Sequence, residues 1–140
     1  MPEQSLFDEL GGEPVLRKII ARFVDRVFDD VMIGFFFRKV SREHLAAREY
    51  EFAARHLGAD VVYTGRPIAE AHAAHPIMGG QFMRRLKILD DTLLESGVPE
   101  RVREHWLRHT ESLRQMVTRD SGGRCDPTSA AERVLRGTGR

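Results

Sequence analysis

Residues 11–28 read GGEPVLRKIIARFVDRVF, and this stretch decides the fold class. Pro14 stands near its start, where a helix tolerates proline because the missing N–H would have no partner there. Apolar side chains then recur in pairs every four positions, which places them on one face of a buried helix. These side chains belong to Val15, Leu16, Ile19, Ile20, Phe23, Val24, Val27 and Phe28. We therefore predict a long amphipathic helix here.

The rest of the chain also favours helices. Ser41 is a typical N-cap and Gly58 a typical C-terminal stop, and a further short helix is expected to end before Pro76. The later helices are predicted at residues 41–58, 67–74, 81–96 and 99–119. The last helix is expected to bury Val102, Trp106, His109, Leu113, Met116 and Val117. No strand-like alternation runs for more than a few residues, so we predict an all-α fold.

A short apolar segment, MIGFFF at residues 32–37, follows the first long helix. It is too short for a full helix and too apolar for an exposed loop. We therefore predict a tight, buried corner.

Composition limits the domain organisation and the partners. The 140 residues are 41% hydrophobic, which suits one globular domain, predicted at residues 1–119, followed by a Gly- and Ser-rich tail at 120–140. The 22 basic and 21 acidic residues are interspersed and leave a net charge of +1. Neither nucleic acid nor a membrane is therefore an expected partner.

We expect a cytoplasmic protein, because we find no membrane-length apolar run and no signal-like start. The single cysteine, Cys125, agrees with a reducing compartment.

Several motifs occur in an order and at a spacing that resemble the truncated haemoglobin family. They are the stretches 6–12, LFDELGG; 35–37, FFF; 51–58, EFAARHLG; 63–67, YTGRP; and 96–99, SGVP, with His72, Ile77 and Phe82 between the last two. The resemblance covers about residues 5 to 118 and needs no gap. It implies a globin-like, two-over-two sandwich of helices, a fold that holds haem in this family.

The haem-binding residues of the family carry over only in part. The proximal histidine, which precedes a phenylalanine, falls on Gln81 before Phe82, and the distal tyrosine falls on Val24. The helical position that often supplies a glutamine falls on Glu49, and a carboxylate donates no hydrogen bond unless it is protonated. An amide is also a poor iron ligand compared with imidazole. The resemblance therefore implies a degenerate haem site.

Other residues of the haem site survive at matching positions. If haem is bound, the resemblance places it against Phe37, Leu45, Arg48, Glu49, Phe52, Gln81 and Phe82, with Arg48 available to pair with a propionate.

Two of the substituted residues allow more than one interpretation. Gln81 is either an unusual haem ligand or, as we favour, a helix-start residue whose amide bonds nearby backbone groups. Glu49 either faces a cavity with its pKa raised by desolvation, or rotates out to pair with Arg48 or Arg55, which we favour.

Histidines at helical spacing are the candidate metal ligands. His72 and His75 are three residues apart, a spacing that can place two imidazoles on one metal, and His109 lies on the apolar face of the last helix. No third ligand for the first pair is evident. The favoured interpretation is that the pair is solvated and that His109 is a core histidine bonded to a backbone carbonyl.

Local substitutions do not fill the implied haem cavity. An empty pocket forfeits packing contacts, so larger side chains would be expected to fill it if haem were lost. Val24 and Ala53 are instead smaller than the residues that the family often has at these positions. Either the Gly79-Gly80 segment lets the proximal helix collapse inward with Phe35 and Phe36, or a ligand occupies the space.

The sequence is compatible with two functions. The favoured hypothesis is a haem-free or haem-dispensable regulatory or interaction module, whose partner is another protein, a second copy of the chain or a small apolar molecule. The alternative is a haem protein with a non-standard iron ligand that binds or senses O2, NO or a peroxide. An enzyme without haem is disfavoured, because we find no nucleophile beside a base, no phosphate loop and no convincing zinc spacing.

Overall fold

The structure, a computed structural model, describes residues 4–65 and 77–118. Within these residues the chain forms helices joined by turns, with one isolated bridge between Ile77 and Thr118. The elements are α1 (Leu6–Leu10), α2 (Gly12–Asp29), the 3-10 helix η1 (Gly34–Phe37), α3 (Arg42–His56), α5 (Gly79–Glu95), α6 (Glu100–Ser112) and α7 (Arg114–Val117). The predicted all-α fold is confirmed.

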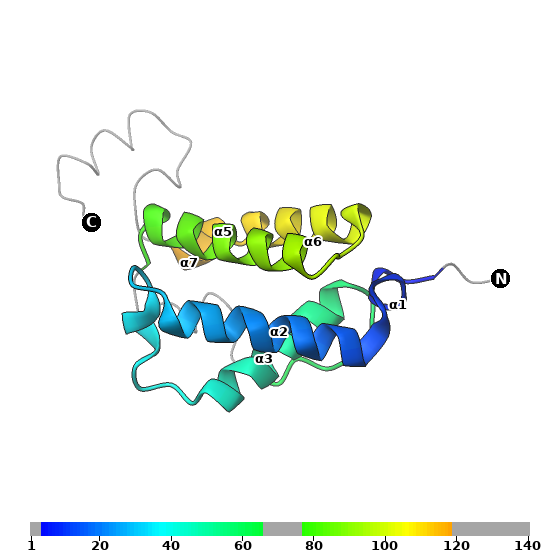
Figure 1. Cartoon of the computed structure of the whole chain (residues 1–140), viewed down its shortest axis with the longest axis horizontal. Helices are drawn as coiled ribbons and strands as arrows, with labels where there is room; N and C mark the ends of the chain where they lie inside the picture. Colours follow the sequence, from blue (N-terminus) through cyan, green and yellow to red (C-terminus); the bar gives the residue numbers. More distant parts are fainter. Residues whose placement is uncertain (1–3, 66–76, 119–140) are drawn as a thin grey trace.

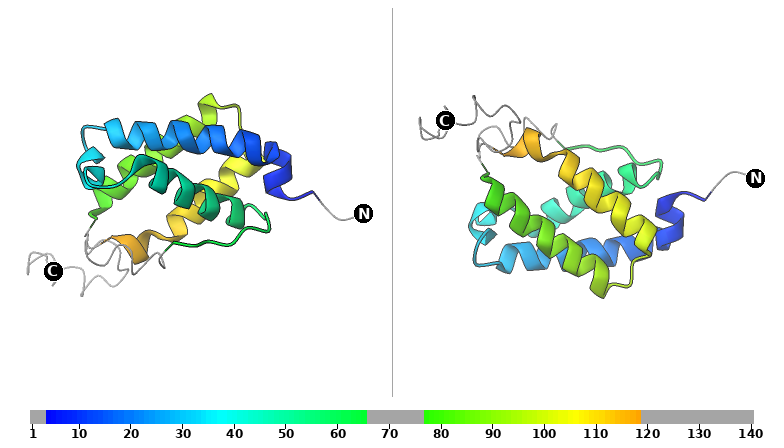
Figure 2. Two further views of the ribbon diagram at one scale, coloured as in Figure 1. Left: turned by 90° about the horizontal axis from the view of Figure 1, so that it is seen from below. Right: turned by 90° about the horizontal axis from the view of Figure 1, so that it is seen from above.

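The helices form two layers. In Figure 1, α5 and α6 lie together above α2 and α3, and Figure 2 shows the helices of each layer crossing at an angle. Both α3 and α5 pack on α2, whereas α3 and α5 have little backbone contact with each other. This is the predicted two-over-two arrangement, with α2 as the element that joins the layers.

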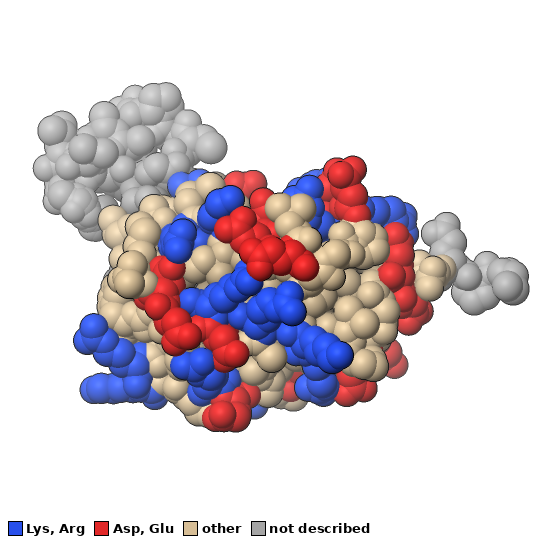
Figure 3. Space-filling view, viewed as in Figure 1, with Lys and Arg blue, Asp and Glu red and all other residues tan. Residues whose placement is uncertain are grey.

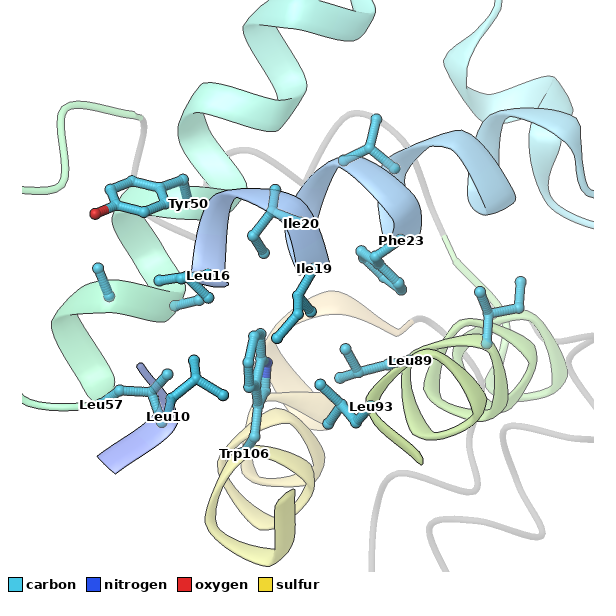
Figure 4. Packing of buried hydrophobic residues seen from close by; sticks show 14 of the residues in the cluster. Leu10, Leu16, Ile19, Ile20, Phe23, Tyr50, Leu57, Leu89, Leu93 and Trp106 are labelled. Atoms are coloured by element: carbon cyan, nitrogen blue, oxygen red, sulfur yellow. The ribbon is translucent and has the colours of Figure 1, made fainter. Parts of the chain in front are cut away.

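The apolar stripe of α2 forms the centre of the core. Leu16, Ile19, Ile20, Phe23, Val24 and Val27 are all buried. Trp106 of α6 faces this stripe and lies among Leu10, Ile19 and Leu93 (Figure 4). The sequence prediction for this helix is confirmed, except that Val15 is exposed at its edge.

Helix α3 begins where Ser41 predicts. The Ser41 hydroxyl accepts a hydrogen bond from the His44 N–H at 3.2 Å, which satisfies one of the unpaired donors at the helix start. The helix ends at His56, followed by Leu57 and then Gly58 with a φ of +105°. Glycine favours this left-handed backbone, as expected for a C-terminal stop.

Replacing Ser41 with alanine removes this cap and is expected to lower the free energy of unfolding by about 1 kcal/mol. Urea unfolding followed by circular dichroism measures the change. Ser96→Ala is the matched control, because the Ser96 hydroxyl only accepts a hydrogen bond from exposed Arg22. An equal loss in both variants would contradict a specific cap.

The corner at residues 32–37 is only partly buried, so this prediction was wrong in detail. Phe35 and Met32 are 46% and 45% exposed, whereas Phe36 and Phe37 pack against the core. A 3-10 helix has three residues per turn, so three consecutive aromatic rings cannot all face inward. The corner is tight at Gly34, where an added Cβ would lie 2.6 Å from the Phe28 carbonyl oxygen.

The last predicted helix breaks after Ser112. The hydroxyls of Thr110, Ser112 and Thr118 donate to backbone carbonyls three or four residues earlier, which competes with regular helix bonds. Helix α7 resumes at Arg114 with Val117 buried, but Met116 is exposed rather than buried as predicted.

Two predictions fall on other parts of the chain. The short helix at 67–74 and the tail at 120–140 lie outside the described residues, so the proposed domain boundary stays a prediction. In the part that is described, no helix is long and apolar enough to cross a membrane.

Candidate functional site

The residues expected around a haem lie on facing elements. Helix α3 carries Leu45, Arg48, Glu49 and Phe52, helix α5 carries Gln81 and Phe82 near its start, η1 carries Phe37 and α6 carries His109. His72 and His75 lie outside the described residues.

Gln81 uses its amide to hold the start of α5. Its Oε1 accepts a hydrogen bond from the Met78 backbone N–H at 2.9 Å. This contact gives a partner to the Met78 N–H, which would otherwise be unpaired at the helix terminus. The helix-start interpretation of Gln81 is therefore the one that the geometry supports.

Glu49 pairs across the site, not along its own helix. Nη2 of Arg85 donates to both carboxylate oxygens of Glu49 at 3.0 Å, and both side chains are more than two-thirds buried. The Arg85 guanidinium also lies 4.9 Å from the centroid of the Phe23 ring. The expectation of a partner at Arg48 or Arg55 was therefore wrong, because helix packing offers Glu49 a cation on α5. We call this contact the α3–α5 ion pair.

Arg48 is engaged with a neighbouring carboxylate. It donates to Glu51 at 3.0 Å, and Glu51 also accepts from the Thr64 backbone N–H at 2.8 Å and from the Thr64 hydroxyl. The backbone hydrogen bond from Thr64 is the main reason that the pKa of Glu51 is lowered. Arg48 thus helps to anchor the segment after α3.

The aromatic residues of the site contact one another or charged groups. Phe37 stacks on Phe28 with ring centroids 5.3 Å apart, and Phe52 lies edge-on to Tyr63 at 5.5 Å. Phe82 is buried, and the Arg114 guanidinium lies 5.9 Å from its centroid.

Three imidazoles gather where α3 ends against α6. His56 and His109 stack with centroids 4.1 Å apart and planes 14° apart, and His105 stacks on His56 at 5.4 Å. The Nδ1 atoms of both His56 and His109 are buried and have no hydrogen-bond partner among the described residues. The carbonyl contact predicted for His109 is made by His105 instead, whose Nε2 donates to the His56 oxygen at 3.1 Å. We call these three residues the histidine stack.

Burial lowers the pKa of His56 and of His109. Desolvation, with a smaller contribution from the other two imidazoles, lowers the pKa of His56 to about 3. Desolvation also lowers the pKa of His109, again with His105 as a secondary cause. His56 is therefore neutral at physiological pH.

The described residues do not fit haem iron at the family's ligand position. The amide of Gln81 is engaged with the backbone, Val24 is 1% exposed and has no donor, and Glu49 is held by Arg85. Across residues 4–65 and 77–118, no three His, Cys, Asp or Glu side chains are arranged to hold a metal ion. One alternative was that the helix after Gly79-Gly80 collapses inward with Phe35 and Phe36. Phe36 packs against the core, but Phe35 is too exposed to fill the site.

A surface groove lies elsewhere, between α2 and α5. Its volume is about 430 Å³, and its charged residues pair across it, Arg84 with Asp30 and Arg26 with Glu95. Figure 3 shows the mixture of positive and negative side chains on this face. The groove is therefore a network of surface ion pairs, and it does not include Gln81 or Glu49.

Two residues of the site were not identified from the sequence. Arg85 lies four positions after Gln81, so helical spacing could have placed it on the same face. His56 gave no such signal, because its contact with His109 depends on how α3 and α6 pack.

Comparisons with known proteins agree with this architecture. The family model described as bacterial-like globin matches residues 5–119. The group 1 truncated hemoglobin GlbN of Mycolicibacterium paratuberculosis is 32% identical over 95 residues, covering 68% of this chain and 70% of that protein. The protein of the same name from Synechocystis sp. is 32% identical over 100 residues, covering 69% and 81%.

Solved structures show the same fold. The crystal structure of truncated hemoglobin from Tetrahymena pyriformis in the Fe(III) form matches with a TM-score of 0.77 and 25% identity, covering 82% of this chain and 98% of that one. The chain therefore belongs to the bacterial-like, truncated globin family.

Proposed function

We propose that this chain is a truncated globin whose scaffold serves as a haem-free or haem-dispensable interaction module. Its partner would be another protein, a second copy of the chain or a small apolar molecule, and its role regulatory. The observation that carries the proposal is the α3–α5 ion pair. It joins α3, which carries Leu45, Glu49 and Phe52, to α5, which carries Gln81 in its first turn.

The ion pair connects two helices that otherwise have little contact. Helices α3 and α5 both rest on α2 but have little backbone contact with each other, so long side chains must connect them. Arg85 and Glu49 make this connection, with Arg85 also against Phe23. A buried charge left without its partner is strongly destabilising. A haem placed between these helices would therefore have to displace a paired contact and would gain no imidazole from Gln81.

Thermal unfolding of the protein purified without haem tests this proposal. We expect a cooperative transition of an all-helical protein, with no change in Tm when one equivalent of ferric haem is added. A ligand that binds the folded state raises Tm, by several degrees when its concentration is about a hundred times Kd. A molten or aggregating haem-free chain, or a clear rise in Tm with haem, would contradict the proposal.

The second candidate is a haem protein with a non-standard iron ligand that binds or senses O2, NO or a peroxide. Its support is the haemoglobin names of the relatives, together with the buried, unbonded imidazole nitrogens of His56 and His109. Imidazole is the usual protein ligand in globins. The quadruple variant His56→Ala, His72→Ala, His75→Ala and His109→Ala should then lose haem affinity; unchanged affinity would eliminate these ligands.

A further inference from the structure

Three exposed methionines lie where the start of α5 meets α7. Met78 is the N-cap of α5, Met83 lies in the second turn of that helix, and Met116 belongs to α7. Their side chains are 48%, 42% and 47% exposed. The bridge between Ile77 and Thr118 holds the two segments side by side. We call the three residues the methionine patch. Unbranched thioether side chains adapt to irregular apolar partners and are common on binding surfaces.

A cation stands among these methionines. Nη1 of Arg114 lies 3.9 Å from Sδ of Met83, and its guanidinium lies 5.9 Å from the centroid of the Phe82 ring. Both of these neighbours are uncharged. The Nε atom of Arg114 is buried and has no hydrogen-bond partner among the described residues. Because a buried donor without a partner costs free energy, the patch favours a partner that combines an apolar face with a carboxylate.

The C-terminal segment SAAERVLR, residues 129–136, has this combination. Ser129 is followed three positions later by Glu132, which is the capping-box pattern of a helix start, and Gly137 suits a helix end. In such a helix one face would carry the apolar side chains of Ala130, Ala131, Val134 and Leu135. Glu132 would stand at the edge of this face.

The segment is tethered to the patch itself. Thr118, the last residue that the structure describes, is bridged to Ile77 beside Met78, and the ten residues 119–128 connect it to the segment. A linker of ten residues has an r.m.s. length of about 16–19 Å. A tether of this kind gives an effective concentration in the millimolar range, so an intrinsic dissociation constant of about 0.1 mM would keep the segment bound about 90% of the time.

We propose that residues 129–136 of the chain bind the methionine patch as a short helix. Val134 and Leu135 cover the methionine side chains, as in other complexes where an amphipathic helix lies on an apolar surface. The carboxylate of Glu132 accepts a hydrogen bond from Arg114. While the segment is bound, the patch is closed to other partners. This surface is separate from the α3–α5 ion pair, so the inference goes beyond the proposed function and its test involves no haem.

Methionine oxidation in the full-length protein tests this proposal. Hydrogen peroxide converts exposed methionine to the sulfoxide, and peptide mass spectrometry gives the rate at each position. The rates are taken at low conversion, because the polar sulfoxide would itself weaken binding. The patch methionines should oxidise about five- to tenfold more slowly in the wild type than in Leu135→Asp. Met32 is the internal reference, since it is 45% exposed and lies on the corner, across the start of α5 from α7 (Figure 2). Its rate should be the same in both proteins, which also shows that the variant is folded.

Arg136→Gln is the matched control, because it makes the same change in net charge as Leu135→Asp but on the opposite face of the segment. It should keep the protection, whereas Glu132→Lys, which places a like charge beside Arg114, should lose it. Binding within one chain does not depend on protein concentration, so the protection should persist on dilution. Equal oxidation rates in the wild type and Leu135→Asp, or full protection in Glu132→Lys, would overturn the proposal. Protection that disappears on dilution would overturn it too, because a second copy would then cover the patch.

Discussion

A triple variant, Gln81→His with Glu49→Gln and Arg85→Leu, is expected to bind ferric haem, whereas we expect no saturable binding by the wild-type chain. The histidine restores an imidazole at the position where the family binds iron, and imidazole is a far better ligand than an amide. The other two changes remove the α3–α5 ion pair without leaving one of its charges buried and alone. Absorbance titration should show one-to-one binding with a sharp Soret band.

The double variant Glu49→Gln, Arg85→Leu is the control for this experiment. It opens the space between α3 and α5 but supplies no imidazole, so we expect at most weak haem binding without a sharp band. The single variant Gln81→His separates the two effects, because the ion pair still spans the site. A triple variant that folds but fails to bind haem would show that these three residues are not what excludes it.

Replacing Trp106 with alanine should have the largest effect on stability. Its side chain is 4% exposed and lies at the centre of the core, against residues from three other helices (Figure 4). Large-to-alanine changes of buried aromatic residues lower the free energy of unfolding by about 3–5 kcal/mol, because they lose transfer energy and leave a cavity. That is a large fraction of the about 5–15 kcal/mol that stabilises a typical domain. For a chain of this length we expect Tm to fall by about 10–15 °C.

Urea unfolding followed by far-UV circular dichroism measures this loss without relying on tryptophan emission. Leu94→Ala is the matched control on a neighbouring helix, because Leu94 is 55% exposed. Its effect should stay within about 0.5 kcal/mol. A Trp106→Ala variant that is as stable as Leu94→Ala would mean that Trp106 does not hold the two layers together.

Much of the fold could be predicted from local sequence signals. The paired apolar residues of α2, the cap at Ser41 and the end of α5 at Ser96 are each encoded within a few residues, and the structure has them where the pattern places them. The corner was harder, because hydrophobic composition alone does not say how a 3-10 helix divides its rings between core and solvent. Phe35 is exposed because three consecutive rings on a 3-10 helix cannot all face inward.

The site could be predicted only where a single helix decides it. The amide of Gln81 bonds within its own first turn, so its role as a helix-start residue could be inferred. The partners of Glu49 and His109 lie 36 and more than 50 positions away in the chain, and they depend on the relative rotation of packed helices. Periodicity places a side chain on a face but does not say which residue of another helix meets it.

An absorbance titration of the purified wild-type protein with ferric haem tests directly whether this globin scaffold works without haem. We predict only the broad absorbance of non-specifically bound haem, rising in proportion to the haem added and without saturation. A sharp Soret band that reaches a plateau at one equivalent, and that shifts on reduction and on addition of carbon monoxide, would contradict the proposed haem-free function. It would mean that the chain holds haem iron through a ligand other than Gln81.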